Sequence, residues 1–408
     1  MKTVFTISIL ICMMLIASIA WSMIIYVDDD APPGGDGSEE YPFQYIQEGI
    51  DAAEIGDTVS VAEGKYEENI DLKSGVEVIG AGADVTTITA SSGYVVTADN
   101  IGSEVVISGF TIDGQWTSSR GISCVRNSSP TINDNIITHS AYGILCTDSS
   151  PVIMNNTITY LLEHALRCEA SRPIICDNVI SHVGIDAIWF GHGSAAITNN
   201  KIIDVGGAGI KCWGTGGAFI EDNEITESTI GIECRDKSRP IIRRNVIREN
   251  FLYGIAVYSL SRPDIGTEVE PGLNEIFNNG DYNIYSENSA EIKAELNWWG
   301  QIIPHPDYFY GNIDYKPWLK EPVHPPSIGG HVSNCKTGEP VDSALVIAIR
   351  KAEKVKTFTD KDSYYDIYDL EPGFWLLICI KKGYELHIAK VDVKAGECTM
   401  HVFCLEPK

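Results

Sequence analysis

The chain has 408 residues, 44% of them hydrophobic, which is enough apolar material for a buried core and excludes wholesale disorder. Its net charge of −26 is unevenly distributed, because residues 1–326 carry 19 basic and 44 acidic residues, whereas residues 327–408 carry 11 and 12. A surface this acidic repels nucleic acid and anionic lipid headgroups, so neither is expected as a partner.

Residues 1–22 have the features of an export signal. Lys2 supplies an early positive charge, and the run from Val4 to Ala20 is apolar apart from one threonine and two serines. Such a segment is typical of a secretory signal peptide, although its continuation to Ile25 would also allow an uncleaved anchor. We therefore expect an extracytoplasmic protein, secreted or at the cell surface, with no membrane contact beyond this anchor.

The next predicted element is a short helix. Within Phe43–Glu54, the residues Ile46, Ile50 and Ala53 follow helical spacing, which predicts an amphipathic helix with one apolar face. A helix in this position would cap the elements that follow it.

From Ser128 onward the sequence repeats about every 22 residues. An isoleucine lies three residues before, and another two residues after, each of a series of asparagines: Asn135, Asn156, Asn178, Asn200, Asn223 and Asn245. A further apolar ladder runs through Ile122, Ile144, Leu166, Ile188, Ile210, Ile232 and Ile255.

These ladders predict a parallel β-helix over residues 23–320. Each repeat holds about three short alternating runs, and stacking the coils about 4.8 Å apart pairs every run with its counterparts above and below. The result would be three parallel sheets around a dry interior. We expect the asparagines to mark a bend, because asparagine tolerates left-handed backbone angles, and their amides to hydrogen-bond along the axis.

Cysteines belong to the same pattern. Five of them lie two residues after the third apolar ladder, where Phe190 and Val257 take the remaining places: Cys124, Cys146, Cys168, Cys212 and Cys234. Exchange with phenylalanine and valine favours core thiols; a disulfide between neighbouring coils or a soft-metal site stays open.

A second module follows the repeats. Residues 321–327 (EPVHPPS) form a proline-rich linker, and residues 328–408 read as short strands separated by turns, which predicts a small antiparallel β-sandwich. Its four cysteines, Cys335, Cys379, Cys398 and Cys404, allow three disulfide pairings or none.

Two families resemble these segments. Tyr26-Val-Asp-Asp-Asp-Ala, Gly56-Asp-Thr-Val and Gly64-Lys-Tyr, with the 22-residue coils, resemble pectin-lyase-like right-handed β-helix proteins, including NosD-like proteins and carbohydrate-binding and sugar-hydrolase repeats. This resemblance covers about residues 24–320. It implies the right-handed fold but leaves function open, because the superfamily holds lyases, hydrolases, esterases, epimerases and non-enzymatic surface proteins. For the NosD-like members it implies an accessory role in metal-site maturation.

The carboxy-terminal segment is similar to carboxypeptidase-regulatory-like, transthyretin-like domains. The matching residues include Gly338-Glu-Pro340, Thr359-Asp360, Pro372-Gly373 and Gly383-Tyr384. The resemblance implies an accessory module without catalytic residues.

Candidate catalytic residues are few. Gly191-His192-Gly193 and Gly209-Ile210-Lys211, with Asp186 nearby, resemble polygalacturonase motifs. Inversion at a glycosidic bond needs two or three carboxylates that flank it, and only Asp186 and Asp204 are candidates. Tripeptides of this kind also arise by accident in a repeat protein. Asp186 and His192 are therefore candidate catalytic residues only under the alternative hypothesis that the protein is an enzyme.

A surface stripe is the preferred ligand-binding site. Residues that alternate with the inward isoleucines and cysteines should point outward on one sheet: Arg167, Trp189, Lys211, Glu233, Trp213 and Arg235. Trp189 and Trp213 fall on neighbouring coils, where flat rings could stack on sugar faces while the charged groups hold hydroxyls or uronates. Mutual packing of these side chains is the alternative.

A third column follows each asparagine by four residues: His139, Tyr160, His182, Asp204, Glu227 and Glu249. Imidazole and carboxylate could bind a transition metal, but the tyrosine interrupts the histidines, so a solvated turn is preferred. No metal ligand and no cofactor are therefore assigned, and only Ca²⁺ between acidic groups stays open.

The sequence thus favours an exported, non-catalytic β-helix protein that binds polysaccharide. A polysaccharide-degrading hydrolase or lyase is the alternative. A structural envelope protein or a metal-maturation accessory protein is the further alternative.

Overall fold

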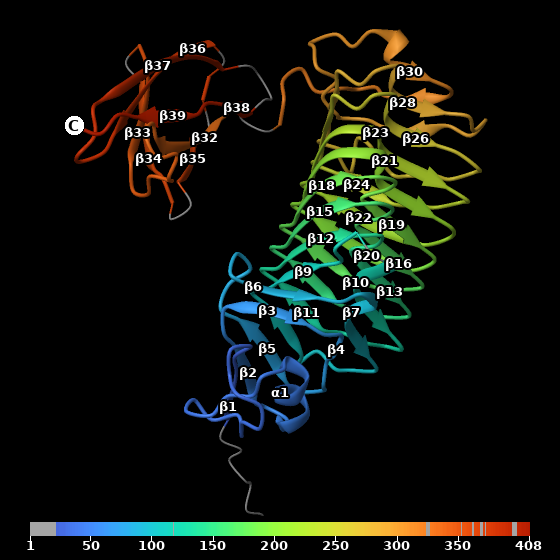
Figure 1. The fold of residues 1–408 in the computed structure, drawn as a ribbon. Helices are drawn as coiled ribbons and strands as arrows, with labels where there is room; N and C mark the ends of the chain where they lie inside the picture. The colour runs from blue at the N-terminus through green and yellow to red at the C-terminus, as the bar shows by residue number, and fades with distance from the viewer. Residues whose placement is uncertain are drawn as a thin grey trace, which may run out of the picture.

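The computed structural model describes residues 22–116, 118–323, 327–351, 353–360, 363–367, 370–371, 373–393 and 398–408. The predicted signal or anchor over residues 1–21 and part of the predicted linker lie outside these residues. Two bodies of strands follow one another along the chain: a long parallel β-helix and a smaller carboxy-terminal module (Figure 1). None of the helices in the described residues is long and apolar enough to span a bilayer.

One long parallel sheet of the β-helix takes one strand from almost every coil. In sheet order its strands are β1 (Ile24–Val27), β2 (Thr58–Val61), β5 (Glu77–Gly80), β8 (Val106–Ser108), β11 (Thr131–Asn133), β14 (Val152–Met154), β17 (Ile174–Cys176), β20 (Ser194–Thr198), β22 (Gly217–Glu221) and β24 (Ile241–Arg243). Strands of successive coils therefore lie directly above one another, as the 22-residue period predicts.

The second long sheet contains the remaining two runs of each coil. Its strands are β3 (Gly64–Glu67), β4 (Ile70–Asp71), β6 (Thr86–Thr89), β7 (Ser92–Asp99), β9 (Thr111–Asp113), β10 (Ser118–Val125), β12 (Ile136–Ser140), β13 (Ile144–Thr147), β15 (Thr157–Leu161), β16 (Leu166–Glu169), β18 (Val179–Val183), β19 (Ile188–Gly191), β21 (Lys201–Trp213), β23 (Glu224–Arg235), β25 (Val246–Arg248), β26 (Tyr253–Val257), β27 (Glu275–Phe277), β28 (Tyr282–Ser286) and β30 (Phe309–Tyr310).

The expected three long sheets are therefore two. The second and third runs of a coil share one sheet because strands such as β21 and β23 pass through the corner between them without ending. A short pair, β29 (Ile292–Lys293) and β31 (Ile313–Asp314), and the 3-10 helix η1 (Pro306–Tyr308) lie near the end of the β-helix.

The interior consists of the predicted ladders. The isoleucines and leucine that flank the asparagines or precede the cysteines are buried in one continuous core. Cys124, Cys146 and Cys168 lie over one another in register and are free thiols, as are Cys212 and Cys234. The prediction of core thiols is confirmed.

An unbroken column of amides runs along one corner of the β-helix. The backbone N–H and the side-chain amide of each asparagine donate to the side-chain oxygen of the asparagine one coil on, from Asn135 to Asn297. The left-handed backbone angle falls one residue earlier, for example at Asp177 (φ 58°) and Asn199 (φ 55°). The ladder asparagine therefore stabilises the bend through the hydrogen bonds of its buried side chain. This corrects the expectation that its own backbone angle would be left-handed.

Helix α1 (Ile46–Ala52) lies at the amino end of the β-helix (Figure 1). Ile46, Ile50 and the following Ala53 are buried in the β-helix core. The helix contacts β1, β2 and β4. Its apolar face is thus the one that the helical spacing predicts.

The carboxy-terminal module contains two sheets. One consists of β34 (Glu353–Phe358), β33 (Leu345–Arg350), β36 (Gly373–Ile380) and β37 (His387–Val393), all antiparallel. In the other, β32 (Ser327–Asn334) pairs with β35 (Tyr364–Ile367), β38 (Cys398–Met400) and β39 (Phe403–Leu405). Residues of both sheets share one hydrophobic core.

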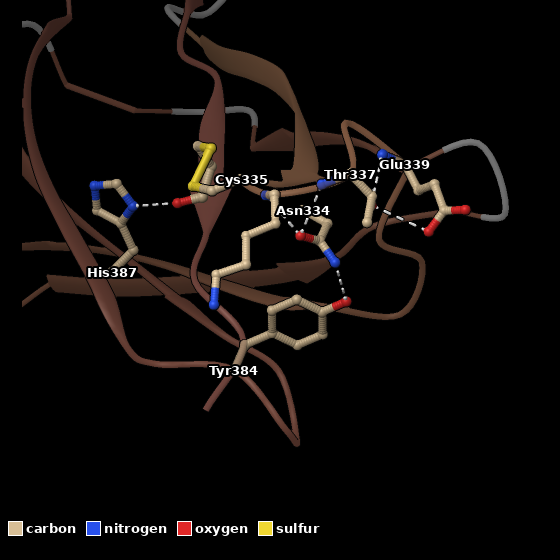
Figure 2. Close-up of a disulfide and its surroundings, with 8 residues drawn as sticks. Asn334, Cys335, Thr337, Glu339, Tyr384 and His387 are labelled. Atoms are coloured by element: carbon tan, nitrogen blue, oxygen red, sulfur yellow. Dashed lines mark hydrogen bonds between the residues drawn. A yellow bond between two sulfur atoms is a disulfide. The ribbon is translucent and has the colours of Figure 1, made fainter.

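A disulfide joins Cys335, which follows β32, to Cys404 in β39 (Figure 2). Beside it, the Nδ1 atom of His387 lies 2.8 Å from the carbonyl oxygen of Cys404. Cys379 is a buried free thiol. The sequence left the pairing open, and the fold selects this pair because it brings β32 and β39 side by side.

Candidate functional site

The predicted stripe forms two columns on the outer surface of the second long sheet. In-register pairing places Arg167, Trp189, Lys211 and Glu233 in the first column, on β16, β19, β21 and β23. Two residues further along the same strands, Glu169, Gly191, Trp213 and Arg235 form the second column. The six predicted residues are therefore neighbours on one surface.

Trp189 is the central aromatic group of the stripe. The guanidinium carbon of Arg167 lies 5.0 Å from the centroid of its ring. A side chain at Gly191 would meet the same indole, because a Cβ atom there would come within 2.5 Å of the ring. The ring therefore occupies the space that a glycine leaves on its own strand. On the neighbouring strand Trp213, which is 37% exposed, pairs directly with Gly191.

The charged residues of the stripe neutralise one another. Glu233 is only 4% exposed, and it contacts the guanidinium of Arg235 and, at 3.1 Å, the ammonium of Lys211. The Arg235 guanidinium also lies 4.1 Å from the ring centroid of Tyr258. Alternation along the strand correctly puts Glu233 outside the core, but these long basic side chains cover it, so it differs from the expected solvent-facing group.

Asp186 is similarly enclosed. It is 3% exposed, its Oδ1 atom accepts a hydrogen bond of 2.9 Å from the backbone N–H of Ala208, and its Oδ2 atom lies 3.6 Å from both Lys211 Nζ and His164 Nδ1. Burial lowers the pKa of His164, so its imidazole is neutral at pH 7. Lys211 thus bridges two buried carboxylates, Asp186 and Glu233.

His192 does not join this cluster. Asp186 precedes β19 and His192 follows it. An extended strand rises about 3.3 Å per residue, so the four residues of β19 alone hold the two backbones about 10 Å or more apart. The His192 ring instead lies over Gly214 of the next coil, and Asp204 pairs with His182 at 3.7 Å. The predicted catalytic pair is therefore spread over both ends of one strand.

Sequence reasoning missed a hollow that continues the stripe toward the amino end. It measures about 290 Å³ and is lined by Tyr94, Arg120, Tyr142, Leu145, Thr147, Arg167 and Glu169. The guanidinium carbon of Arg120 lies 5.5 Å from the ring centroid of Tyr94 and 5.9 Å from that of Tyr142. Arg120 and Tyr142 precede members of the third apolar ladder by two positions, and Tyr94 likewise precedes Val96, which pairs with Ile122 of that ladder. This spacing could have identified them.

Stacked tyrosines continue the stripe in the other direction. The ring centroids of Tyr253 and Tyr285 are 4.6 Å apart, and those of Tyr285 and Tyr310 are 4.9 Å apart. Burial, together with the charge of Glu233, raises the pKa of Tyr258, which lies beside them, to about 12. Aromatic and basic side chains thus follow one another along the axis from β7 to β30.

The third predicted column forms a separate ladder of rings. The ring centroids of His139 and Tyr160 are 5.9 Å apart, and those of Tyr160 and His182 are 4.6 Å apart. Every member of this column has a left-handed backbone angle, which explains why its side chains project from a bend. Within the described ranges, no three His, Cys, Asp or Glu side chains gather in a way that could hold a metal ion.

Two family models match parts of the chain. Residues 143–298 match the right-handed β-helix region, which agrees with the strand register. The repeat region of the chain is a right-handed parallel β-helix. Residues 80–205 match the family described as periplasmic copper-binding protein (NosD). The copper in that description does not fit the described residues, since they offer no metal-ligand cluster and the column thiols are buried in the core.

Solved structures with a similar backbone share little sequence. The A-module of the Azotobacter vinelandii mannuronan C-5 epimerase AlgE6 is 15% identical, with 68% of this chain and 94% of that chain covered and a TM-score of 0.48. The pectate lyase Pel9A is 13% identical, with 74% and 80% covered and a TM-score of 0.43. The Bacillus anthracis TIE protein is 18% identical, with only 22% and 17% covered and a TM-score of 0.20. Similarity at this level implies no shared activity.

No curated protein matches the chain.

Proposed function

We propose that the chain is an exported protein that binds polysaccharide at the cell surface without catalysing a reaction. The observation that carries this proposal is the position of Trp189. Its indole lies over Gly191 and is flanked by Arg167, and Gly191 pairs with Trp213 of the next coil. Flat aromatic groups with polar neighbours suit the apolar faces and hydroxyls of sugars.

The burial and ion pairing of the acidic groups favour binding over catalysis. General acid–base chemistry on a glycosidic bond needs carboxylates that reach the bond, whereas Asp186 and Glu233 are buried and bound to basic side chains. A polysaccharide-degrading enzyme is the second candidate, because these two carboxylates meet at one ammonium beside the Trp189 ring. A structural envelope protein, which would bind no glycan, is the third.

The remaining parts fit an extracytoplasmic rod. The apolar run before residue 22 would direct export, and the family description of residues 80–205 names a periplasmic protein. Helix α1 would cap the first coil, where an open end would expose apolar side chains. The carboxy-terminal module would be a β-sandwich of the carboxypeptidase-regulatory-like type and serve as an accessory domain.

Glycan-array binding by the full chain tests the proposal. The double variant Trp189→Ala/Trp213→Ala should weaken binding at least about tenfold, equivalent to about 1.4 kcal/mol. Phe219→Ala is the matched control, because this exposed aromatic residue belongs to the other long sheet. Equal binding by the wild-type and double-variant proteins would refute the role of the stripe.

A parallel assay separates the second candidate. An enzyme would release reducing sugar or an unsaturated product, and Asp186→Asn would abolish that release. If neither glycan binding nor product release is detected, the role of a structural envelope protein remains.

A further inference from the structure

The outer surface of one sheet in the carboxy-terminal module is apolar where an exposed sheet is ordinarily polar. In β36, the alternate residues Trp375, Leu377 and Cys379 point into the core. The residues between them point the other way and are still apolar: Phe374, Leu376, Ile378 and Ile380. The strand is thus hydrophobic on both sides, although only one side has a core to cover it.

Strand register extends this surface across the whole sheet. Leu345 pairs with Phe358 and with Ile380, and Ile378 pairs with Ile347 and with Ile388. We call the resulting set the outer face: Leu345, Ile347, Ile349, Phe358, Phe374, Leu376, Ile378, Ile380 and Ile388. Phe358, Phe374 and Ile388 remain 58%, 59% and 51% exposed. A contiguous apolar surface of this kind marks an interaction site.

The charged groups on the outer face are mainly basic. Lys354 and Lys356 pair with Ile349 and Ile347 from the edge strand β34. Lys390 pairs with Leu376 from the opposite edge strand, β37, and its ammonium lies 3.9 Å from the ring centroid of Phe374. Asp392, which pairs with Phe374, adds an acidic residue to this surface.

We propose that the outer face docks on an anionic phospholipid surface. Lysine side chains lay their apolar stems along a hydrophobic surface while the ammonium groups reach a polar layer, and near an anionic bilayer each contributes to binding. A lipid interface therefore accepts the aliphatic rows and the lysines together. This property goes beyond the proposed glycan binding and does not depend on it. It departs from the expectation, drawn from the net charge of the whole chain, that anionic lipid is no partner, because the lysines are concentrated on one face.

A second copy of the chain fits this surface less well. Two outer faces packed together would bring six lysines and two aspartates of the paired positions to one interface, and the excess of like charges would oppose this contact. The net charge of residues 327–408 conceals this arrangement, because 11 basic and 12 acidic residues nearly cancel. Screening at 0.1 M salt limits the repulsion from the acidic β-helix to those of its charges that come within about 10 Å of the lipid.

Hydroxyl-radical footprinting of the full chain tests the proposal. Vesicles of phosphatidylglycerol and phosphatidylcholine should protect Phe374, Leu376 and Ile388 from oxidation, whereas Met400 on the other sheet and Phe219 on the β-helix should stay reactive. Pure phosphatidylcholine should protect them much less. Because footprinting reports single residues, a membrane contact by the apolar amino-terminal run would not be mistaken for protection of the outer face.

Two variants complete the test in the same footprinting experiment. Leu376→Glu/Ile388→Glu should remove the protection of Phe374, with Met400→Glu as the matched control. Replacing Lys354, Lys356 and Lys390 by glutamine should weaken docking about a hundredfold. Near-UV circular dichroism, to which the buried Trp375 contributes, verifies that each variant is folded.

Three results would overturn the proposal: outer-face residues that stay reactive with anionic vesicles, equal protection by both lipids, or a lipid-free dimer that Leu376→Glu/Ile388→Glu converts to a monomer. The last result would identify a second copy as the occupant.

Discussion

The amide column makes a strong prediction about stability, which the substitution Asn178→Ala tests. The side-chain nitrogen of Asn178 lies 2.9 Å from the carbonyl oxygens of Ile153 and Cys176 and from Asn200 Oδ1. Its Oδ1 atom accepts 3.0 Å hydrogen bonds from the backbone N–H and the side-chain amide of Asn156. The residue is 1% exposed, so water cannot replace these partners.

Alanine at position 178 would leave the backbone N–H of Asn156 buried and unsatisfied. An orphaned donor costs about 1–3 kcal/mol, and each further hydrogen bond lost costs about 1 kcal/mol. Four further hydrogen bonds of the side chain are lost with it, so we expect the free energy of unfolding to fall by about 5–7 kcal/mol. Because coils of a solenoid contact mainly their neighbours, the loss should concentrate around residues 153–200.

Urea denaturation measures the total effect, and native-state hydrogen exchange followed by mass spectrometry locates it. Asn312→Ala is the control, because this asparagine is exposed and should change stability by less than about 0.5 kcal/mol. A loss below about 1 kcal/mol for Asn178→Ala, or faster exchange spread evenly over the β-helix, would refute the idea that the column stabilises each bend locally.

Three further predictions concern the stripe and the core. Gly191→Ala should displace the Trp189 ring and weaken glycan binding about as much as Trp189→Ala, with unchanged thermal stability; undiminished binding would contradict the role of the glycine. Hydrogen bonds with its neighbouring column thiols, together with burial, hold the pKa of Cys146 well above its usual value. Iodoacetamide at pH 8 should therefore label Cys146 in urea but not in the folded protein, and native labelling would argue against a closed core. Burial lowers the pKa of His164 below 6.5, so the unfolded chain binds the proton more tightly and stability should fall as the pH drops below about 6.5. His164→Gln should reduce the difference in melting temperature between pH 7.5 and 5.5, and an unaltered difference would show that other groups cause it.

The repeat made most of the fold predictable. One strand pairs with the equivalent strand of the next coil, so a fixed period in the sequence translates directly into vertical register. The Cys124, Cys146 and Cys168 column and the isoleucine ladders follow from this rule alone. The same rule missed Asn274 and Asn297, which continue the amide column, because an insertion between coils stretches the spacing to 29 residues.

The predicted stripe was right in its placement and incomplete in its chemistry. Alternation along a strand decides which side of the sheet a residue occupies, and it correctly put Glu233 and Lys211 outside the core. Alternation carries no information on the conformation that a long side chain adopts once it leaves the sheet. The fold of Arg235 and Lys211 over Glu233, and the distance between Asp186 and His192, depend on side-chain packing and on the path of a whole coil.

The sequence by itself determined the solenoid, its period, its inward residues and the order of its modules, because local alternation and strict repetition encode all four. Only the tertiary structure decided which charged groups neutralise one another, where Trp189 finds space, which cysteines form the disulfide and how the lysines of the carboxy-terminal module gather on an apolar face. These features join residues of different strands, coils or sheets at contact distance, and such contacts exist only once the backbone has brought them together.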